Sequence, residues 1–233
     1  MWGLTPAESE ALFLSLKVAL CSVAASLPVA VALAWVLSRL RFTGKGFLDA
    51  VIHLPLVLPP VVVGYFLLVL FGRRGPIGTW LYEYLGVTFA FHWTGAALAS
   101  AVMGFPLLVR AVRQSLDSVD MGLEAAAATL GASPAWVFTT VTLPLILPGI
   151  VTGVLLSFAR SLGEFGATIT FVSNIPGETQ TLPLAIYSFT QVPGGDAQAL
   201  RLCILSVILS LAALSTSEYL LRHANVRVGG RDA

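Results

Sequence analysis

Two oppositely charged residues, Arg160 and Glu164, follow a run of 35 residues that carries no charge. Residues four apart lie on the same face of a helix, so this arginine and this glutamate can form an ion pair. Pairing would offset part of the roughly 2.5 to 3.5 kcal/mol that an arginine costs at the centre of a membrane helix. The stretch 159–180 is also rich in Gly, Ser and Thr. It therefore has two interpretations: it lines a path for a polar solute, or the ion pair is a structural link between helices.

Residues suited to covalent, metal or nucleotide chemistry do not form a recognisable motif. Gly44 and Lys45 lack the upstream glycine and the downstream hydroxyl of a GxxxxGK[ST] phosphate loop, so we expect no ATP hydrolysis by this chain. The three histidines share no metal-ligand spacing, and no Ser-His-Asp or Cys-His arrangement is evident. Cys21 and Cys203 lie within apolar stretches, which favours packing roles over a disulfide. We predict no catalytic residues, no metal ligands and no cofactor bound by this chain.

The composition is typical of an integral membrane protein. Of the 233 residues, 57% are hydrophobic and only 11% are charged, and the mean hydropathy is +0.87. Such a chain is too apolar for a soluble domain. Five stretches are long enough to cross a bilayer. We predict an all-α membrane domain with about five spans, at 11–37, 48–71, 94–109, 141–159 and 200–221.

Basic residues predict the orientation of these spans. Eight of them lie in the loops after the first and third spans and in the tail, and three lie on the other side. The eight are Arg39, Arg41, Lys45, Arg110, Arg113, Arg222, Arg227 and Arg231, and the three are Arg73, Arg74 and Arg201. By the positive-inside rule the first set is cytoplasmic. We therefore expect an extracytoplasmic N-terminus at 1–10, a transmembrane domain at 11–222 and a cytoplasmic tail at 223–233.

The proline-rich segments LPLVLPP (54–60) and LPLILPG (143–149) are near copies, each at the cytoplasmic end of a span. Proline lacks an amide hydrogen and loosens the first turns of a helix. The freed carbonyls need partners in a membrane, so such segments face neighbouring helices or a water-filled cavity. A hinge or a pathway lining is one interpretation, and an ordinary helix kink is the other.

The charge-free run from Ala125 to Ala159 is too long for one span. Thirty-five helical residues reach roughly 52 Å, against a hydrocarbon core of about 30 Å. Helix-breaking residues occur part-way along the run, between residues 131 and 134. The run must divide into a short helix outside the bilayer and a span that follows it.

Local signals locate both helices. Asp120 is a suitable N-cap, Glu124 adds negative charge near the positive end of the helix, and the four alanines that follow are strong helix formers. Gly131 supplies the left-handed residue that ends a helix. Ser133 then caps a second helix whose first residue is Pro134, where a missing amide hydrogen costs nothing. The sequence predicts helix, tight turn, helix.

This stretch resembles the "EAA" coupling loop of type I ABC-importer permeases. In that pattern Glu-Ala-Ala is followed by three residues, Gly, nine residues, an aliphatic residue, one more residue and Leu-Pro. Glu124 lies one place before the glutamate position of the pattern, and we expect its docking role there. The residues in register are Ala126, Ala127, Gly131, Val141, Leu143 and Pro144. The resemblance implies a cytoplasmic coupling helix within a loop at 118–144 and the type I importer fold.

From about Leu14 to Leu221 the chain also resembles molybdate permease subunits. The likeness includes HLPLVLPPVVVGY at 53–65, GRRGPIG at 72–78 and the stretch 159–180. It implies a multi-pass subunit of a bacterial inner-membrane importer for molybdate, with tungstate as a related substrate. It also implies a homodimer, two cytoplasmic ATPase subunits that bind ATP and magnesium, and an external molybdate-binding protein.

Two alternatives stay open at this point. A sulfate or thiosulfate permease subunit would have the same fold, because these substrates are also tetrahedral dianions. An ion-coupled secondary transporter would need no ATPase docking loop, and would more typically show repeated halves or several ionisable residues within the membrane.

Overall fold

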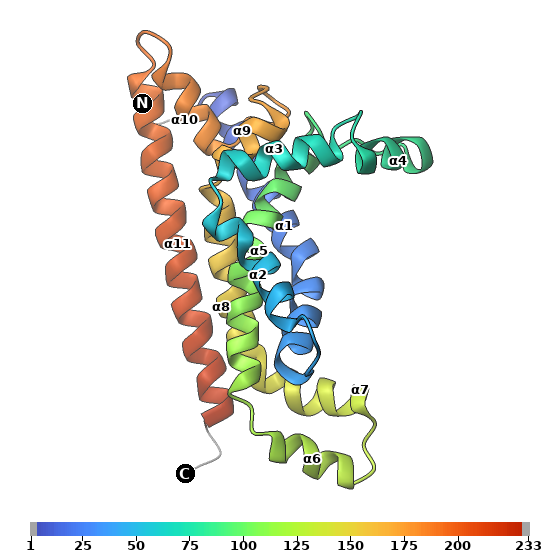
Figure 1. Ribbon diagram of the computed structural model, residues 1–233. Coiled ribbons are helices and arrows are strands. Elements are labelled where there is room, and N and C mark those ends of the chain that lie inside the picture. Colours follow the sequence, from blue (N-terminus) through green and yellow to red (C-terminus); the bar gives the residue numbers. More distant parts are fainter. Residues whose placement is uncertain (1–3, 230–233) are drawn as a thin grey trace.

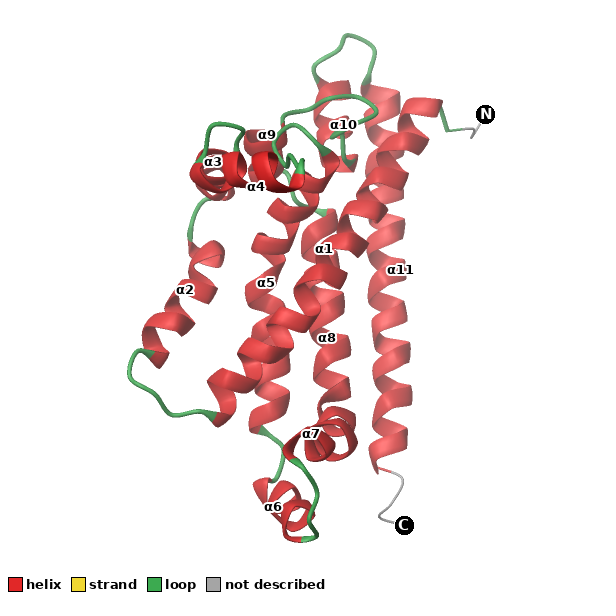
Figure 2. Ribbon diagram, turned by 90° about the vertical axis from the view of Figure 1, so that its right-hand side faces the viewer, coloured by secondary structure: helices red, strands yellow, loops and turns green. Residues whose placement is uncertain are grey.

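Four long helices form the body of the molecule, and each contains a window apolar enough to cross a membrane. They are α1 (Pro6–Arg39), α5 (Trp93–Asp117), α8 (Leu143–Leu162) and α11 (Asp196–Gly229). The computed structural model describes residues 4–229, and within this range all regular structure is helical (Figure 2). Residues 223–229 of the predicted tail continue α11. Residues 1–3 of the predicted N-terminal segment and 230–233 of the tail lie outside the described residues.

The predicted span at 48–71 is not one straight helix. It divides into α2 (Lys45–Val57) and α3 (Pro60–Phe71), whose axes differ by 114°. Pro59 and Pro60 cause the break because neither has an amide hydrogen to continue the helical ladder. If this bent pair counts as one span, the described residues contain five candidate spans; otherwise they contain four. The proline segment at 54–60 thus produces a sharp change of direction, whereas α8 continues through Pro148.

Short helices lie at both ends of this body. At the upper end in Figure 1 are α3, α4 (Pro76–Leu85), α9 (Gly166–Val172) and α10 (Leu182–Thr190). At the lower end are α6 (Met121–Thr129) and α7 (Pro134–Val137). A π-helical turn at Phe138–Thr142 joins α7 to α8. The chain therefore begins α1 at the upper end and ends α11 at the lower end.

Small residues bring α5 and α8 into close contact. A Cβ atom on Gly149 would collide with the side chain of Ser115, and one on Gly104 would collide with that of Ser157. Close backbone approach through small residues is a common way for helices to associate in membranes. The contact positions α8 along most of the length of α5, and it fixes the surface between these two helices.

Three apolar clusters hold the helices together. One joins the lower halves of α1, α5 and α8 with α2 around Leu37, Leu108 and Ile146. A second joins α1, α3, α5 and α9 around Phe171. In the third cluster, α10 and α11 pack against the start of α1. Helices α1 and α5 thus take part in clusters at both ends of the body, and α6 belongs to none of these clusters.

The helix that contains the third predicted span extends beyond it. Helix α5 continues eight residues past Val109, so Arg110 and Arg113 lie on the helix rather than in a loop. Arg113 Nη1 lies 2.7 Å from Asp49 Oδ1 on α2, and its Nε lies 3.7 Å from Asp117 Oδ2 one turn along α5. Buried Val112 and Leu116 pack the inner face of the extension. The predicted loop placement of Arg110 and Arg113 was wrong, because charge was taken as the end of the helix.

Candidate functional site

Helix α6 forms where its N-terminal cap predicts it. The Asp120 carboxylate accepts a hydrogen bond from the backbone amide of Gly122 at 2.8 Å. Glu124 occupies the first turn, where negative charge interacts favourably with the helix dipole. The helix ends at Thr129. The predicted helix over 120–130 is confirmed, except that its first and last residues, Asp120 and Leu130, are the caps and lie outside the helix.

The turn after α6 also follows the sequence signals. Gly131 has a φ of +85°, a left-handed conformation that a residue with a side chain rarely adopts. A Cβ atom there would meet no other atom within 4 Å, so the requirement for glycine is conformational and not steric. Ser133 Oγ accepts from the amide of Trp136 at 3.4 Å, and Pro134 is the first residue of α7. The predicted helix, turn and helix are confirmed.

Glu124 links α6 to two of the long elements. Its Oε1 accepts from Arg39 Nη2 at 2.9 Å, at the end of α1, and from Thr142 Oγ1 at 2.8 Å, just before α8. The side chains of Arg39 and Glu124 are only 11% and 20% exposed. We call these three residues the Glu124 bridge. The carboxylate therefore points into its own chain.

The apolar side chains of α6 are uncovered in this chain. None of the residues of α6 is buried in this chain. Met121 and Leu123 are exposed, and Leu130, directly after the helix, is 89% exposed. An isolated helix of nine residues is marginal in water, so α6 depends on its caps, the Glu124 bridge and whatever covers this apolar side.

The predicted coupling-loop residues occupy different places. Ala126, Ala127, Gly131 and Val141 line one hollow of about 690 Å³ between α6 and α7, together with Leu130, Ala132, Ser133 and Trp136. Leu143 and Pro144 do not line it and instead begin α8. The four in-register residues that share the hollow are those nearest the turn.

Arg160 and Glu164 lie at the other end of α8. Arg160 Nη1 lies 2.6 Å from Glu164 Oε2, and the side chain of Glu164 is only 1% exposed. Glu164 Oε1 accepts from the backbone amide of Ala167 at 2.8 Å, which satisfies a free amide in the first turn of α9. The structure therefore places the predicted ion pair at the junction of α8 and α9, remote from α6 (Figure 1).

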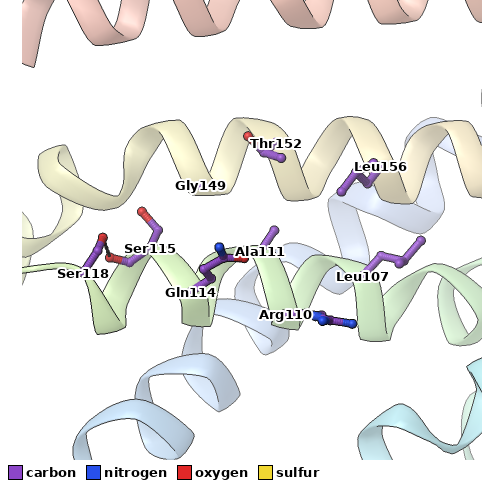
Figure 3. A pocket seen from close by; sticks show the side chains of 9 residues that line it. All are labelled: Leu107, Arg110, Ala111, Gln114, Ser115, Ser118, Gly149, Thr152 and Leu156. Atoms are coloured by element: carbon purple, nitrogen blue, oxygen red, sulfur yellow. Dashed lines mark hydrogen bonds between the residues drawn. The ribbon is translucent and has the colours of Figure 1, made fainter.

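Sequence reasoning missed a polar hollow between α5 and α8. It measures about 580 Å³, and Figure 3 shows the side chains that line it. Within the described range, Arg110 is the only charged residue that lines it, and Gln114 follows one helical turn later. Arg110, Gln114 and Ser118 are four residues apart and therefore share one face of a helix. This spacing could have indicated the hollow from the sequence. It was overlooked because Arg110 was assigned to a loop. Among the described residues, no group of His, Cys, Asp and Glu is suited to hold a metal.

Comparison with known proteins assigns a family to almost the whole chain. The model of the family "binding-protein-dependent transport system inner membrane component" matches residues 26–226. The chain is 60% identical over 226 residues to the molybdenum transport system permease protein ModB of Escherichia coli K12, covering 97% of this chain and 99% of that protein. It is 58% identical to ModB of Haemophilus influenzae, covering 95% and 97% respectively. A probable sulfate transport system permease protein of Chlorokybus atmophyticus is 40% identical, covering 78% of this chain and 63% of that protein.

Solved structures share the fold at low sequence identity. A chain of the inward-facing MetNI methionine ABC transporter matches with a TM-score of 0.69 at 18% identity, covering 96% of this chain and 97% of that one. A chain of a bacterial ABC transporter that imports alginate matches with a TM-score of 0.71 at 16% identity, covering 94% and 80%. The expected transmembrane fold of type I ABC importers is confirmed.

Proposed function

The chain belongs to the family of inner membrane components of binding-protein-dependent transport systems, and on this premise we propose that it moves molybdate, and tungstate by the same chemistry, across the inner membrane. It is a multi-pass permease subunit and not an enzyme, because members of this family leave ATP binding to a partner ATPase. The substrate is proposed from the relatives named for molybdenum transport, which match over nearly the full chain.

The observation that carries the permease role is helix α6. It projects from the end of the long helices, is capped at its start, and buries none of its residues in this chain. A short helix with exposed Met121, Leu123 and Leu130 needs a protein partner to cover these side chains. We assign this side to a cytoplasmic ATPase subunit, and α6 with its flanking loop at 118–144 to the coupling element.

The Glu124 bridge gives α6 a mechanical connection to the spans. Arg39 ends α1 and Thr142 directly precedes α8, so a displacement of α6 acts on both helices through one carboxylate. A rigid link transmits a domain movement that a loose loop would absorb. Closure of the ATPase dimer on ATP would thus shift the spans, and hydrolysis would reset them, as in a two-state element biased by a ligand on another subunit.

The proposed assembly has the composition that the family resemblance implies. Two copies of this chain enclose the pathway, two ATPase subunits bind the two α6 helices, and a molybdate-binding protein delivers the anion from outside. The positive-inside rule supports an outside N-terminus and a cytoplasmic C-terminus. Arg39, Arg41 and Lys45 surround the loop between α1 and α2, at the same end as α6, which agrees with this orientation.

We assign Arg160 and Glu164 to a structural role. Glu164 is buried, joins α8 to the amide of Ala167 in α9, and has Arg160 as its charged partner. A side chain that caps the next helix contributes to folding, whether or not a solute passes nearby. The pathway interpretation of this pair therefore has less support than the structural one.

The proposal is tested by uptake into proteoliposomes. The complete importer, with its ATPase and its binding protein, should accumulate labelled molybdate inside the vesicle only when ATP is supplied on the cytoplasmic side. Excess unlabelled tungstate should compete strongly and excess sulfate weakly. Uptake without ATP, or uptake driven by an ion gradient, would contradict the proposal.

Sulfate is the second candidate substrate. The relative of Chlorokybus atmophyticus, named as a probable sulfate permease, is 40% identical to this chain. Sulfate is a tetrahedral dianion like molybdate, so one membrane fold can serve either. In the same assay, stronger competition by sulfate than by tungstate would favour this candidate.

A further inference from the structure

The hollow between α5 and α8 is lined by a single charged residue among those that the structure describes. Its lining consists of Leu107, Arg110, Ala111, Gln114, Ser115, Ser118, Gly149, Thr152 and Leu156. Figure 3 shows these side chains along the facing turns of the two helices. Arg110 is exposed, although it lies on a helix apolar enough to cross a membrane. An arginine in that position requires water or an anion as its partner.

The nearby carboxylates form ion pairs with a different arginine. Asp49 lies 2.7 Å from Arg113 Nη1, and Asp117 lies 3.7 Å from Arg113 Nε. Among the described residues, no carboxylate lies within ion-pair distance of Arg110. Arg110 and Gln114 also line a second hollow of about 460 Å³ toward α2. Arg110 therefore lines both hollows, and the carboxylates that share the second one with it, Asp49 and Asp117, have Arg113 as their ion-pair partner.

Two of the hydroxyl groups that line the hollow already donate hydrogen bonds to backbone carbonyls. Ser118 Oγ donates to the carbonyl of Ser115 at 2.7 Å, and Thr152 Oγ1 donates to the carbonyl of Pro148 at 2.9 Å. The donors left for a ligand are the Arg110 guanidinium, the Gln114 amide and the Ser115 hydroxyl. All three can donate hydrogen bonds, the side chains of Gln114 and Ser115 can also accept them, and Arg110 is a cation. This set favours an anion over a cation or a neutral sugar.

The fork of a guanidinium donates two parallel hydrogen bonds and matches the oxygen atoms of carboxylates, phosphates and similar oxyanions. Arg110 lies seven residues before the end of α5, which is roughly 10 Å along the helix axis. The position is near the end of the molecule that carries α6, and the side chain is exposed. A site here would lie at the end of the molecule that we assign to the cytoplasm.

We propose that Arg110, with Gln114 and Ser115, forms a transit site for the transported tetrahedral oxyanion on the surface between α5 and α8. The inference rests on the proposed function, because it takes the imported anion as the ligand. The phosphate of a lipid headgroup has the same chemistry, so the test must separate the two sources.

The central experiment uses charge rescue in the reconstituted importer. In a background with Cys21 and Cys203 replaced by alanine, Arg110→Cys should lower the initial rate of ATP-driven molybdate uptake about tenfold, the usual scale for a lost charge-assisted contact. Modification with aminoethyl methanethiosulfonate restores a positive charge and should recover much of the rate. The sulfonatoethyl reagent adds a negative charge and should not. Equal recovery with both reagents would overturn the proposal.

Two controls make the result specific. Arg41→Ala removes another exposed arginine outside the hollow, and should leave uptake unchanged. Arg110→Cys should copurify with the ATPase subunit in the same amount as the wild type, which shows that the complex has assembled. If wild-type importer carries no molybdate, the proposed function fails. If wild type and Arg110→Cys carry it equally, only the transit site fails.

The lipid source is tested by changing the bilayer. The defect of Arg110→Cys should be the same in vesicles of phosphatidylcholine alone and in vesicles that also contain phosphatidylglycerol. A defect seen only with the anionic lipid would assign Arg110 to headgroup binding and would overturn the transit site.

Discussion

Glu124 and Glu164 are both paired with an arginine and with one further donor, yet they connect very different parts of the molecule. Glu164 is almost fully buried and bonds only within residues 160–167, where it joins two consecutive helices. Glu124 is one-fifth exposed and reaches Arg39, 85 residues earlier, and Thr142, 18 residues later. The first arrangement stabilises a local junction. The second ties a projecting helix to two spans, as a transmission element requires.

The largest expected effect is on folding, at Glu164. Glu164→Ala leaves Arg160 without its partner and the Ala167 amide without an acceptor, and should lower the free energy of unfolding by about 3 kcal/mol. Glu164→Gln retains an oxygen for the amide and should lose less. Thermal unfolding in detergent measures both variants. Full stability of Glu164→Ala combined with altered transport would favour the pathway interpretation.

Neutralising both members of that pair sharpens the result. Arg160→Gln with Glu164→Gln removes both charges together, so no buried charge is left unpaired. We expect this double variant to unfold at a higher temperature than Glu164→Ala. If it folds normally but transports poorly, Arg160 and Glu164 act on the solute after all.

Breaking the Glu124 bridge should affect coupling more than folding. Arg39→Ala removes one of two donors to Glu124, and should lower ATP-driven uptake about tenfold, since hydrogen bonds to charged groups contribute about 1.5 to 3 kcal/mol. The permease should still insert and bind its ATPase. Arg41→Ala, two residues along, is the matched control. Equal uptake by the two variants would show that the bridge is not needed.

The uncovered side of α6 should matter only in the complex. Leu130→Ser changes a side chain that is 89% exposed, so the stability of the isolated permease should change by less than about 0.5 kcal/mol. Affinity for the ATPase subunit should fall by roughly tenfold or more, because burial of a leucine contributes about 1.5 to 3 kcal/mol. Binding in detergent, measured by interferometry, checks the prediction. Unchanged affinity would remove Leu130 from the proposed interface.

The smallest effect is expected at the turn. Gly131→Ala places a side chain at a φ of +85° with no steric collision, which should cost about 1 kcal/mol of local strain. Gly131→Asn should cost less, because asparagine tolerates the left-handed region. Affinity for the ATPase subunit should follow the order wild type, Asn, Ala. An alanine variant that binds like the wild type would show that this turn adapts freely.

Local features were predictable from the sequence, and long-range ones were not. The caps at Asp120 and Ser133 and the turn at Gly131 depend on residues within a few positions of each other, so sequence spacing located them correctly. The 114° bend between α2 and α3 depends partly on prolines, which are visible in the sequence. It also depends on packing between helices, which the sequence does not show. The link between Arg39 and Glu124 depends on how α1 and α6 meet.

Arg110 illustrates the same limit in a different way. Hydropathy ended the third span at Val109 because charge is costly in lipid, but α5 continues to Asp117. Arg113 there is neutralised by Asp49, which is 64 residues away in sequence. Only the assembled helices show that Arg113 has partners and that Arg110 faces a polar hollow.

The central claim is that the Glu124 bridge transmits the ATPase motion to the spans. A double-mutant cycle tests it most directly, with the stimulation of ATP hydrolysis by molybdate-loaded binding protein measured for Arg39→Ala, Glu124→Ala and the double variant. The two single changes should each abolish most of the stimulation, the double change should add little, and basal hydrolysis should persist in all three. Strictly additive losses, or full stimulation in either single variant, would contradict the account.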